Sequence, residues 1–170
     1  QWRDFNGVDQ LKNLVYSINT NAHSRRLVVS AWAPHELDEM ALPPCHYAFQ
    51  VYINNGVMDL MWQQRSADVF LGLPYDIAMY GLLLEMLAKG AELKAGQLIG
   101  QLGDCHLYNN HLDQAKEFRR RHNPKLPQLE LDSGIFLSIS NDLYIPESSK
   151  IKLINYNPLS AIKAELSVGK

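Results

Sequence analysis

The sequence predicts a single domain of the mixed α/β (α+β) class that spans residues 1–170. Segments with apolar residues at helical spacing stand beside short runs of β-branched and aromatic residues, and no repeat or linker separates them. The composition, 46% hydrophobic and 20% charged, excludes a disordered or collagen-like chain. A chain of this length buries roughly 70% of the surface that it exposes when unfolded, so a substantial core is expected.

Three helices are expected. In residues 8–20, apolar side chains recur at helical spacing with polar residues between them, which predicts an amphipathic helix. Residues 77–89 are apolar on most faces and precede Gly90, which predicts a buried central helix. Residues 111–121 end in basic side chains, which is typical of a helix C-terminus.

Strands account for most of the remaining apolar segments. Residues 45–53 and 57–64 predict two strands, and the intervening Asn-Asn-Gly predicts a hairpin turn. Residues 27–32 are rich in β-branched side chains and predict a buried strand. Further strands are expected at residues 97–102, 106–108, 129–131, 135–139 and 151–156.

Charge and cysteine content limit the possible partners. The net charge of −2 provides no overall attraction to nucleic acid or to an anionic membrane, so a bound anion needs a local basic cluster. No apolar run approaches the roughly 18 residues that cross a bilayer. Two cysteines suit a reducing compartment, so a cytoplasmic protein is expected. Because the chain opens at Gln1 rather than Met, we also expect a segment upstream.

The two cysteines each precede a histidine, as Cys45-His46 and Cys105-His106. Cys45 follows a proline at the start of a predicted strand, where it is either a nucleophile or a buried structural cysteine. A zinc site is the less favoured interpretation, because neither cysteine has a partner at the spacing typical of structural zinc. We therefore expect no metal.

Two basic pairs could bind phosphate. Arg25-Arg26 and Arg65-Ser66 offer planar guanidinium donors and a hydroxyl, although solvated surface arginines have the same pattern. Asp76 lies near the expected start of the central helix, where a simple helix cap would explain it. No P-loop, G-x-G-x-x-G, H-E-x-x-H or G-x-S-x-G motif is present.

Several motifs, taken in order, resemble those of the thymidylate synthase family along the whole chain. They are QWRDF, NAHSRRLVVSAW, MALPPCHYAFQVYI, QQRSADVFLGLPYDIAMYGLLLEMLA, GDCHLYNNHLDQ and the tail AIKAELSV. The resemblance implies an α/β fold on a mixed sheet with a buried central helix, and a homodimer whose active sites are shared between subunits. It also implies a pyrimidine deoxynucleotide monophosphate as substrate and 5,10-methylenetetrahydrofolate as cosubstrate.

The resemblance also assigns roles to individual residues. Cys45 would be the nucleophile that adds to C6 of the pyrimidine, and His46 would join a hydrogen-bond network around the base. The 5′-phosphate would be bound by Arg65 and Ser66, and by Arg25 and Arg26 of the other subunit. The sugar 3′-hydroxyl would be bound by His106 and Tyr108. The folate would be contacted by Asp68, Leu71, Gly72 and Val168.

Two departures from the family pattern matter. The family's N-terminal third, with its catalytic glutamate, is absent, so we expect it on a missing segment or a separate polypeptide. In addition, Asp76 replaces the family's asparagine in LP[FY]NIASY. A carboxylate cannot donate to O4 of uracil, but it can accept from the amino group of cytosine and from a protonated N3.

The sequence therefore predicts folate-dependent one-carbon transfer to C5 of dCMP, by hydroxymethylation or methylation. The alternative is a thymidylate synthase that methylates dUMP. A third possibility, of another class, is a non-catalytic nucleotide- or RNA-binding relative; the presence of Cys45 and of the phosphate-binding residues argues against it.

Overall fold

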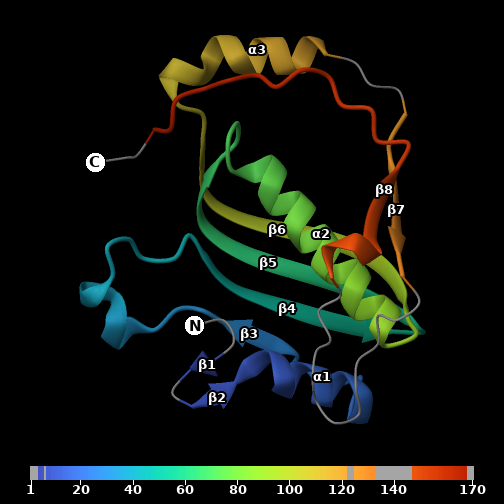
Figure 1. Cartoon of the computed structure of the whole chain (residues 1–170). Helices are drawn as coiled ribbons and strands as arrows, with labels where there is room; N and C mark the ends of the chain where they lie inside the picture. The colour runs from blue at the N-terminus through green and yellow to red at the C-terminus, as the bar shows by residue number, and fades with distance from the viewer. Residues whose placement is uncertain (1–3, 6, 122–124, 133–146, 168–170) are drawn as a thin grey trace.

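A four-stranded mixed sheet organises the computed structural model (Figure 1), which describes residues 4–5, 7–121, 125–132 and 147–167. The strand order is β3-β4-β5-β6, antiparallel from β3 to β5 and parallel between β5 and β6. The strand bounds are β3 Val28–Ser30, β4 His46–Asn54, β5 Val57–Asp68 and β6 Lys94–His106. The predicted mixed sheet is confirmed.

The β4-β5 hairpin forms where the sequence predicts it. Asn55 and Gly56 have φ values of 50° and 77°, the left-handed pair that a two-residue hairpin turn requires. The returning strand runs four residues past the predicted end at Gln64, because β6 continues to pair with it as far as Asp68 and His106. Sequence patterning underestimates β5 because this support comes from a distant strand.

Strand β6 is continuous, whereas the sequence suggested two separate pieces. Gly100 makes close packing possible at its centre. A Cβ atom there would lie 2.4 Å from the indole ring of Trp62, which the parallel register places opposite. The glycine therefore makes room for a large ring on the inner face of the sheet.

Helix α2, Leu73–Gly90, lies across that inner face, and helix α1, Gln10–Thr20, lies beside β3 (Figure 1). Both helices contribute to one hydrophobic core. Helix α1 begins two residues after its predicted start because Asp9 caps it by accepting from the backbone N–H of Lys12. The core includes Leu14, Val15, Ile18, Leu27, Val29, Phe49, Val51, Met58, Leu60, Trp62, Tyr80, Leu84 and Leu87.

Helix α2 is central, but it is only partly buried in this chain. It begins four residues before its predicted start, with Pro74 in its first turn. Tyr80, Leu84 and Leu87 face the sheet and are buried. Tyr75 and Met79 are 77% and 52% exposed. An apolar flank of the helix is thus open in the described residues.

The remaining elements lie outside the main sheet. They are β1 Asp4–Phe5, β2 Val8–Asp9, η1 Pro34–Glu39, η2 Asn109–His111, α3 Leu112–Arg120, β7 Gln128–Leu131, η3 Ser148–Lys150 and β8 Ile151–Ile154. Strands β7 and β8 pair antiparallel. The strand expected at residues 135–139 lies outside the described residues. No helix among the described residues is long and apolar enough to cross a membrane.

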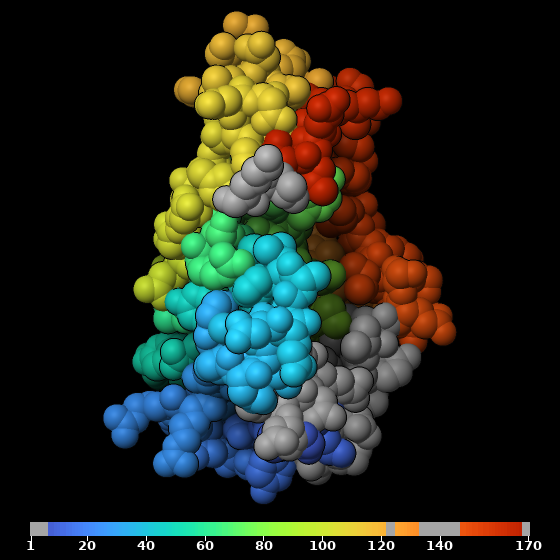
Figure 2. Space-filling model, turned by 90° about the vertical axis from the view of Figure 1, so that its left-hand side faces the viewer, coloured from blue at the N-terminus to red at the C-terminus, as the bar shows by residue number. Residues whose placement is uncertain are grey.

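The C-terminal segment returns along α3, and Figure 2 shows the two together above the loop that carries η1. Side chains of η2 hold the segment in place. The His111 ring is completely buried, and its Nε2 lies 2.7 Å from the Glu165 carbonyl oxygen. Asn110 donates to Ser167 Oγ at 2.8 Å, and the hydroxyl donates back at 3.0 Å.

Candidate active site

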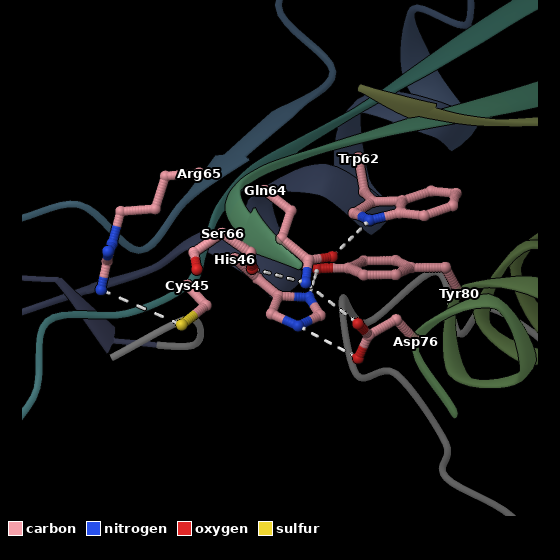
Figure 3. Close-up of polar contacts among 8 residues, drawn as sticks. All are labelled: Cys45, His46, Trp62, Gln64, Arg65, Ser66, Asp76 and Tyr80. Atoms are coloured by element: carbon pink, nitrogen blue, oxygen red, sulfur yellow. Dashed lines mark hydrogen bonds and ion pairs between the residues drawn. The ribbon is translucent and has the colours of Figure 1, made fainter. Parts of the chain in front are cut away.

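A mostly apolar cavity of about 620 Å³ opens between the start of β4 and the flank of α2. Three polar side chains reach it, those of Cys45, His46 and Asp76 (Figure 3). The apolar lining consists of Leu11, Pro44, Phe49, Met79, Tyr80, Leu82, Leu83 and Met86. An apolar cavity with a few convergent polar groups is the usual form of a small-molecule site.

Cys45 lies at the rim of this cavity beside a fixed cation. One guanidinium nitrogen of Arg65, Nη2, is 3.9 Å from its Sγ. The same guanidinium donates to the carbonyl oxygens of Pro43 and Pro44 at 3.0 and 3.1 Å, which holds it against the loop before β4. Cys45 is half-buried, so the alternative of a core cysteine is not supported. A partly exposed sulfur beside a cation is the setting typical of reactive cysteines.

His46 connects Asp76 to Tyr80. Its Nε2 lies 3.2 Å from Asp76 Oδ1, and its Nδ1 lies 3.1 Å from the Tyr80 hydroxyl. Burial, and secondarily the negative charge of Asp76, raise the pKa of Tyr80 well above its usual value of 10.0. Tyr80 therefore remains a phenol that can donate to Nδ1, which leaves Nε2–H to donate to Asp76.

Gln64 contacts the other oxygen of Asp76. The Gln64 side chain is only 3% exposed, and its Nε2 donates to Asp76 Oδ2 at 3.0 Å and to the Ser66 carbonyl oxygen at 2.9 Å. Its Oε1 accepts from the indole Nε1–H of Trp62 at 3.1 Å. Asp76 thus accepts a hydrogen bond at each carboxylate oxygen.

Asp76 is not a helix cap. The N-cap position of α2 is Gly72, and Asp76 lies inside the first turn with its carboxylate directed at Gln64 and His46. The cap interpretation is wrong because α2 begins earlier than the sequence pattern indicates. Hydrogen bonds from Gln64 on β5 and His46 on β4, not a bond from a backbone amide, determine the position of this carboxylate.

Sequence reasoning did not select Trp62, Gln64 or Tyr80. A usable signal was present for Gln64. Inward-facing positions on β5 alternate, and Leu60, Trp62 and Gln64 occupy successive ones. A glutamine in such a series is a buried polar side chain that needs a partner.

The two candidate phosphate-binding pairs, Arg25-Arg26 and Arg65-Ser66, lie in different settings. Arg65 contacts the cavity rim, and Ser66 follows it on β5. Arg25 and Arg26 lie in the exposed loop between α1 and β3 and do not line the cavity. Within this chain the structure therefore brings together only Arg65 and Ser66, and a role for the other pair across a dimer stays a prediction.

The residues expected to bind sugar and folate meet where β5 and β6 end. Asp68 pairs with His106 in the parallel register, and the rings of His106 and Tyr108 are in edge contact at 4.9 Å. Asp68 Oδ1 accepts from the backbone N–H groups of Phe70 and Leu71, which shapes the turn into α2. These residues are separate from the cavity that Cys45 lines.

A second cavity, of about 780 Å³, adjoins this turn. Leu71, Pro74 and Tyr75 form one wall, and residues 158–162 of the C-terminal segment form another. Gly72 is tightly packed, because a Cβ there would lie 3.1 Å from the Asp68 carbonyl oxygen. Val168, the remaining residue expected at the folate, lies outside the described residues.

The zinc interpretation gains no support. Across residues 4–5, 7–121, 125–132 and 147–167, no three His, Cys, Asp or Glu side chains are grouped as a metal site would require. Cys45-His46 begins β4, whereas Cys105-His106 ends β6.

Comparison with known proteins agrees with the fold and with this arrangement of motifs. Residues 1–168 match the family model described as thymidylate synthase, and the chain belongs to the thymidylate synthase family. It is 43% identical to the thymidylate synthase of Mycoplasma pneumoniae over 99% of this chain and 56% of that protein. It is 45% identical to that of Mycoplasma mobile over 99% of this chain and 57% of that protein.

A solved structure gives the same result. The thermostable thymidylate synthase A from Bacillus subtilis superposes with a TM-score of 0.85 and 34% identity, over 96% of this chain and 58% of that one. The expected α+β fold is confirmed. This chain spans a little over half the length of these relatives.

Proposed function

We propose that the protein carrying this chain methylates C5 of dUMP to give dTMP, with 5,10-methylenetetrahydrofolate as cosubstrate. The relatives are named thymidylate synthases, which supports this reaction better than the dCMP reaction that the sequence alone favoured. One observation carries the proposal: Cys45 lines an apolar cavity large enough for a pyrimidine base, and its sulfur lies beside the Arg65 guanidinium.

Cys45 supplies covalent catalysis. Its thiolate adds to C6 of the pyrimidine, and the electrons of the C5–C6 double bond move toward the C4 carbonyl, which makes C5 nucleophilic. C5 then bonds to the one-carbon unit of the folate and loses its proton to a base, and the bond between that carbon and the folate nitrogen breaks, which leaves an exocyclic methylene on C5. The reduced folate supplies the hydride that completes the methyl group, and departure of the sulfur from C6 restores the double bond and frees the enzyme.

Arg65 and Ser66 hold the phosphate end of the nucleotide. Arg65 is already fixed by the Pro43 and Pro44 carbonyl oxygens, so little side-chain entropy is lost when an anion binds it. Its remaining donors suit a phosphate monoester. His106 and Tyr108 bind the sugar 3′-hydroxyl, which would extend the nucleotide from the Cys45 cavity toward the ends of β5 and β6.

A homodimer completes the phosphate site. The outer face of the sheet carries a cross-strand row in register: Val28, Gln50, Met61 and Ile99. Val28 and Ile99 are 46% and 42% exposed, and among the described elements both main helices pack on the opposite face. A second copy that covers this row would exclude apolar surface from water and could bring Arg25 and Arg26 to the partner's nucleotide.

The second cavity fits the cosubstrate. Its wall of Leu71, Pro74 and Tyr75 is apolar and aromatic, which suits the flat ring systems of a folate. Asp68 offers the polar contact at the adjoining turn, and Gly72 keeps the backbone there close-packed.

Asp76 supports dCMP as a second candidate substrate. Its two oxygens accept from Gln64 and His46, so it presents acceptors to the cavity, which suit the amino group of cytosine. With dCMP the product would be a methylated or a hydroxymethylated cytidylate. A third candidate, a non-catalytic nucleotide-binding relative, would leave Cys45 without a chemical role.

One assay separates these candidates. Substitution at C5 releases the C5 hydrogen whichever product forms, so tritium release from [5-³H]dUMP and [5-³H]dCMP reports both reactions. We expect release only when the folate is present, together with a covalent adduct of Cys45 with 5-fluoro-dUMP or its cytidylate analogue. Absence of release and of adduct from the full-length protein would contradict an enzymatic function. A cytoplasmic location stays a prediction from the sequence.

A further inference from the structure

The Gln64 side chain can adopt only one amide orientation. The indole N–H of Trp62 can only donate, and its Nε1 lies 3.1 Å from Gln64 Oε1. The Ser66 carbonyl oxygen can only accept, and it lies 2.9 Å from Gln64 Nε2. Rotating the amide by half a turn would place donor against donor and acceptor against acceptor in a site that is 3% exposed.

This orientation determines which hydrogen bond Asp76 accepts from Gln64. Gln64 Nε2 donates its second hydrogen to Asp76 Oδ2 at 3.0 Å. The other oxygen, Oδ1, lies 3.2 Å from His46 Nε2. Asp76 is therefore held as an acceptor at both oxygens. Each of these oxygens keeps a further lone pair, to which the amino group of cytosine can donate and the O4 carbonyl of uracil cannot.

Trp62 is itself held in a single position. Its ring stacks on Tyr80 with centroids 5.1 Å apart and planes 12° apart, and it packs on Gly100 from the opposite strand. The indole is 4% exposed. Because the ring is packed between Tyr80 and Gly100, packing and not solvent determines the direction of the indole N–H.

We propose that Trp62 is a positioning residue for nucleobase selection, acting through the Gln64 amide on the Asp76 carboxylate. The proposal rests on the proposed function only in that a pyrimidine occupies the cavity of Cys45 and Asp76. It does not depend on which base the enzyme prefers. Trp62 would change the kcat/KM for a base with an amino group at C4 relative to that for a base with a carbonyl there. The indole N–H holds the Gln64 amide, and through it the position of the Asp76 carboxylate, whose acceptors favour the amino group.

The decisive variant is Trp62→Phe in the full-length protein. Phenylalanine retains a ring against Tyr80 and Gly100 and deletes the N–H, so the Gln64 oxygen loses its donor and the amide is held only through its Nε2 contacts to Ser66 and Asp76. We expect the ratio of kcat/KM for dCMP to that for dUMP, measured by tritium release, to fall about three- to tenfold, the effect of one net hydrogen bond. The change should appear mainly in KM.

Trp32→Phe is the matched control. Trp32 precedes η1 and contacts Tyr47 edge to face, away from the cavity lining. Trp32→Phe should leave the ratio of kcat/KM for dCMP to that for dUMP unchanged. Circular dichroism and thermal unfolding establish that both variants are folded.

A spectroscopic measurement tests the contact itself. In protein labelled with ¹⁵N-tryptophan, the indole signal that disappears in Trp62→Phe should move in Gln64→Leu and also in Asp76→Asn, while the Trp32 signal stays in place. A folded Trp62→Phe protein with an unchanged dCMP to dUMP ratio would overturn the inference. Absence of tritium release from both nucleotides in the native protein would instead contradict the proposed function.

Discussion

The two Cys-His dipeptides of this chain have the same chemistry in sequence and different surroundings in the fold. Cys45-His46 starts β4, where the sulfur lies beside Arg65 and the imidazole joins Asp76 to Tyr80. Cys105-His106 ends β6, where the sulfur is exposed. The His106 ring there lies 3.4 Å from Asp104, whose side chain is 78% exposed.

The difference shows what makes a cysteine a candidate nucleophile. Both dipeptides lie at strand ends, so local structure does not distinguish them. The distinction comes from the second element that each one meets. Helix α2 and the end of β5 supply a cavity wall, a cation and a largely buried carboxylate to the first pair, whereas Cys105 is exposed and His106 meets the exposed carboxylate of Asp104.

The largest expected effect is at the first cysteine. Cys45→Ser should lower kcat roughly a thousandfold or more, because the covalent step needs the thiolate, while nucleotide affinity is retained. Tritium release and equilibrium binding measure the two quantities. Cys105→Ala should leave kcat unchanged. Equal losses of kcat in the two variants would contradict the assignment of Cys45 rather than Cys105 as the nucleophile.

The next effect tests whether the first site is completed from outside the chain. Arg25→Ala with Arg26→Ala in one chain should inactivate the enzyme, as should Cys45→Ala in another. Mixing the two chains should restore activity, because one site of each mixed dimer then has both an intact cysteine and intact arginines. If the mixture remains inactive after subunit exchange has been demonstrated, the arginines do not act across the dimer.

A smaller effect concerns the carboxylate that only the first dipeptide contacts. In Asp76→Asn, the amide can donate to O4 of uracil, so the ratio of kcat/KM for dCMP to that for dUMP should fall roughly ten- to hundredfold. Asp104→Asn, beside His106, is the matched change at the other dipeptide and should leave that ratio as it is. An unchanged ratio in Asp76→Asn would mean that Asp76 does not read the base.

The smallest effect is on stability in alkali. Because burial and Asp76 raise the pKa of Tyr80, folding favours its protonated form. The resulting stability is fully present below pH 10 and is lost as pH rises above that value, by about 1.4 kcal/mol per pH unit. Urea unfolding at several pH values should show a shallower alkaline decline in Tyr80→Phe than in the native protein. Tyr108→Phe, the ring neighbour of His106, controls for the loss of a tyrosine hydroxyl; an equal decline in native and Tyr80→Phe proteins would contradict the assignment.

Local sequence determined the elements whose stabilising contacts are short-range. The Asn55-Gly56 turn fixes the β4-β5 hairpin because it supplies the left-handed backbone, and alternating apolar residues assign the inner face of both strands. The family motifs also singled out Cys45, Arg65 and Asp76. The predicted start of the central helix was wrong by four residues, because the first turn is stabilised by the bend at Asp68 and not by its own pattern.

Only the tertiary structure decided which of these groups act together. Gln64 reaches Asp76 across 12 residues and His46 reaches Tyr80 across 34, and no periodicity encodes such pairs. The single strand β6 likewise follows from its pairing with β5, because glycines weaken its own strand pattern. Burial then determines the chemistry, since a buried amide or phenol must satisfy its hydrogen bonds with whichever side chains the fold places around it.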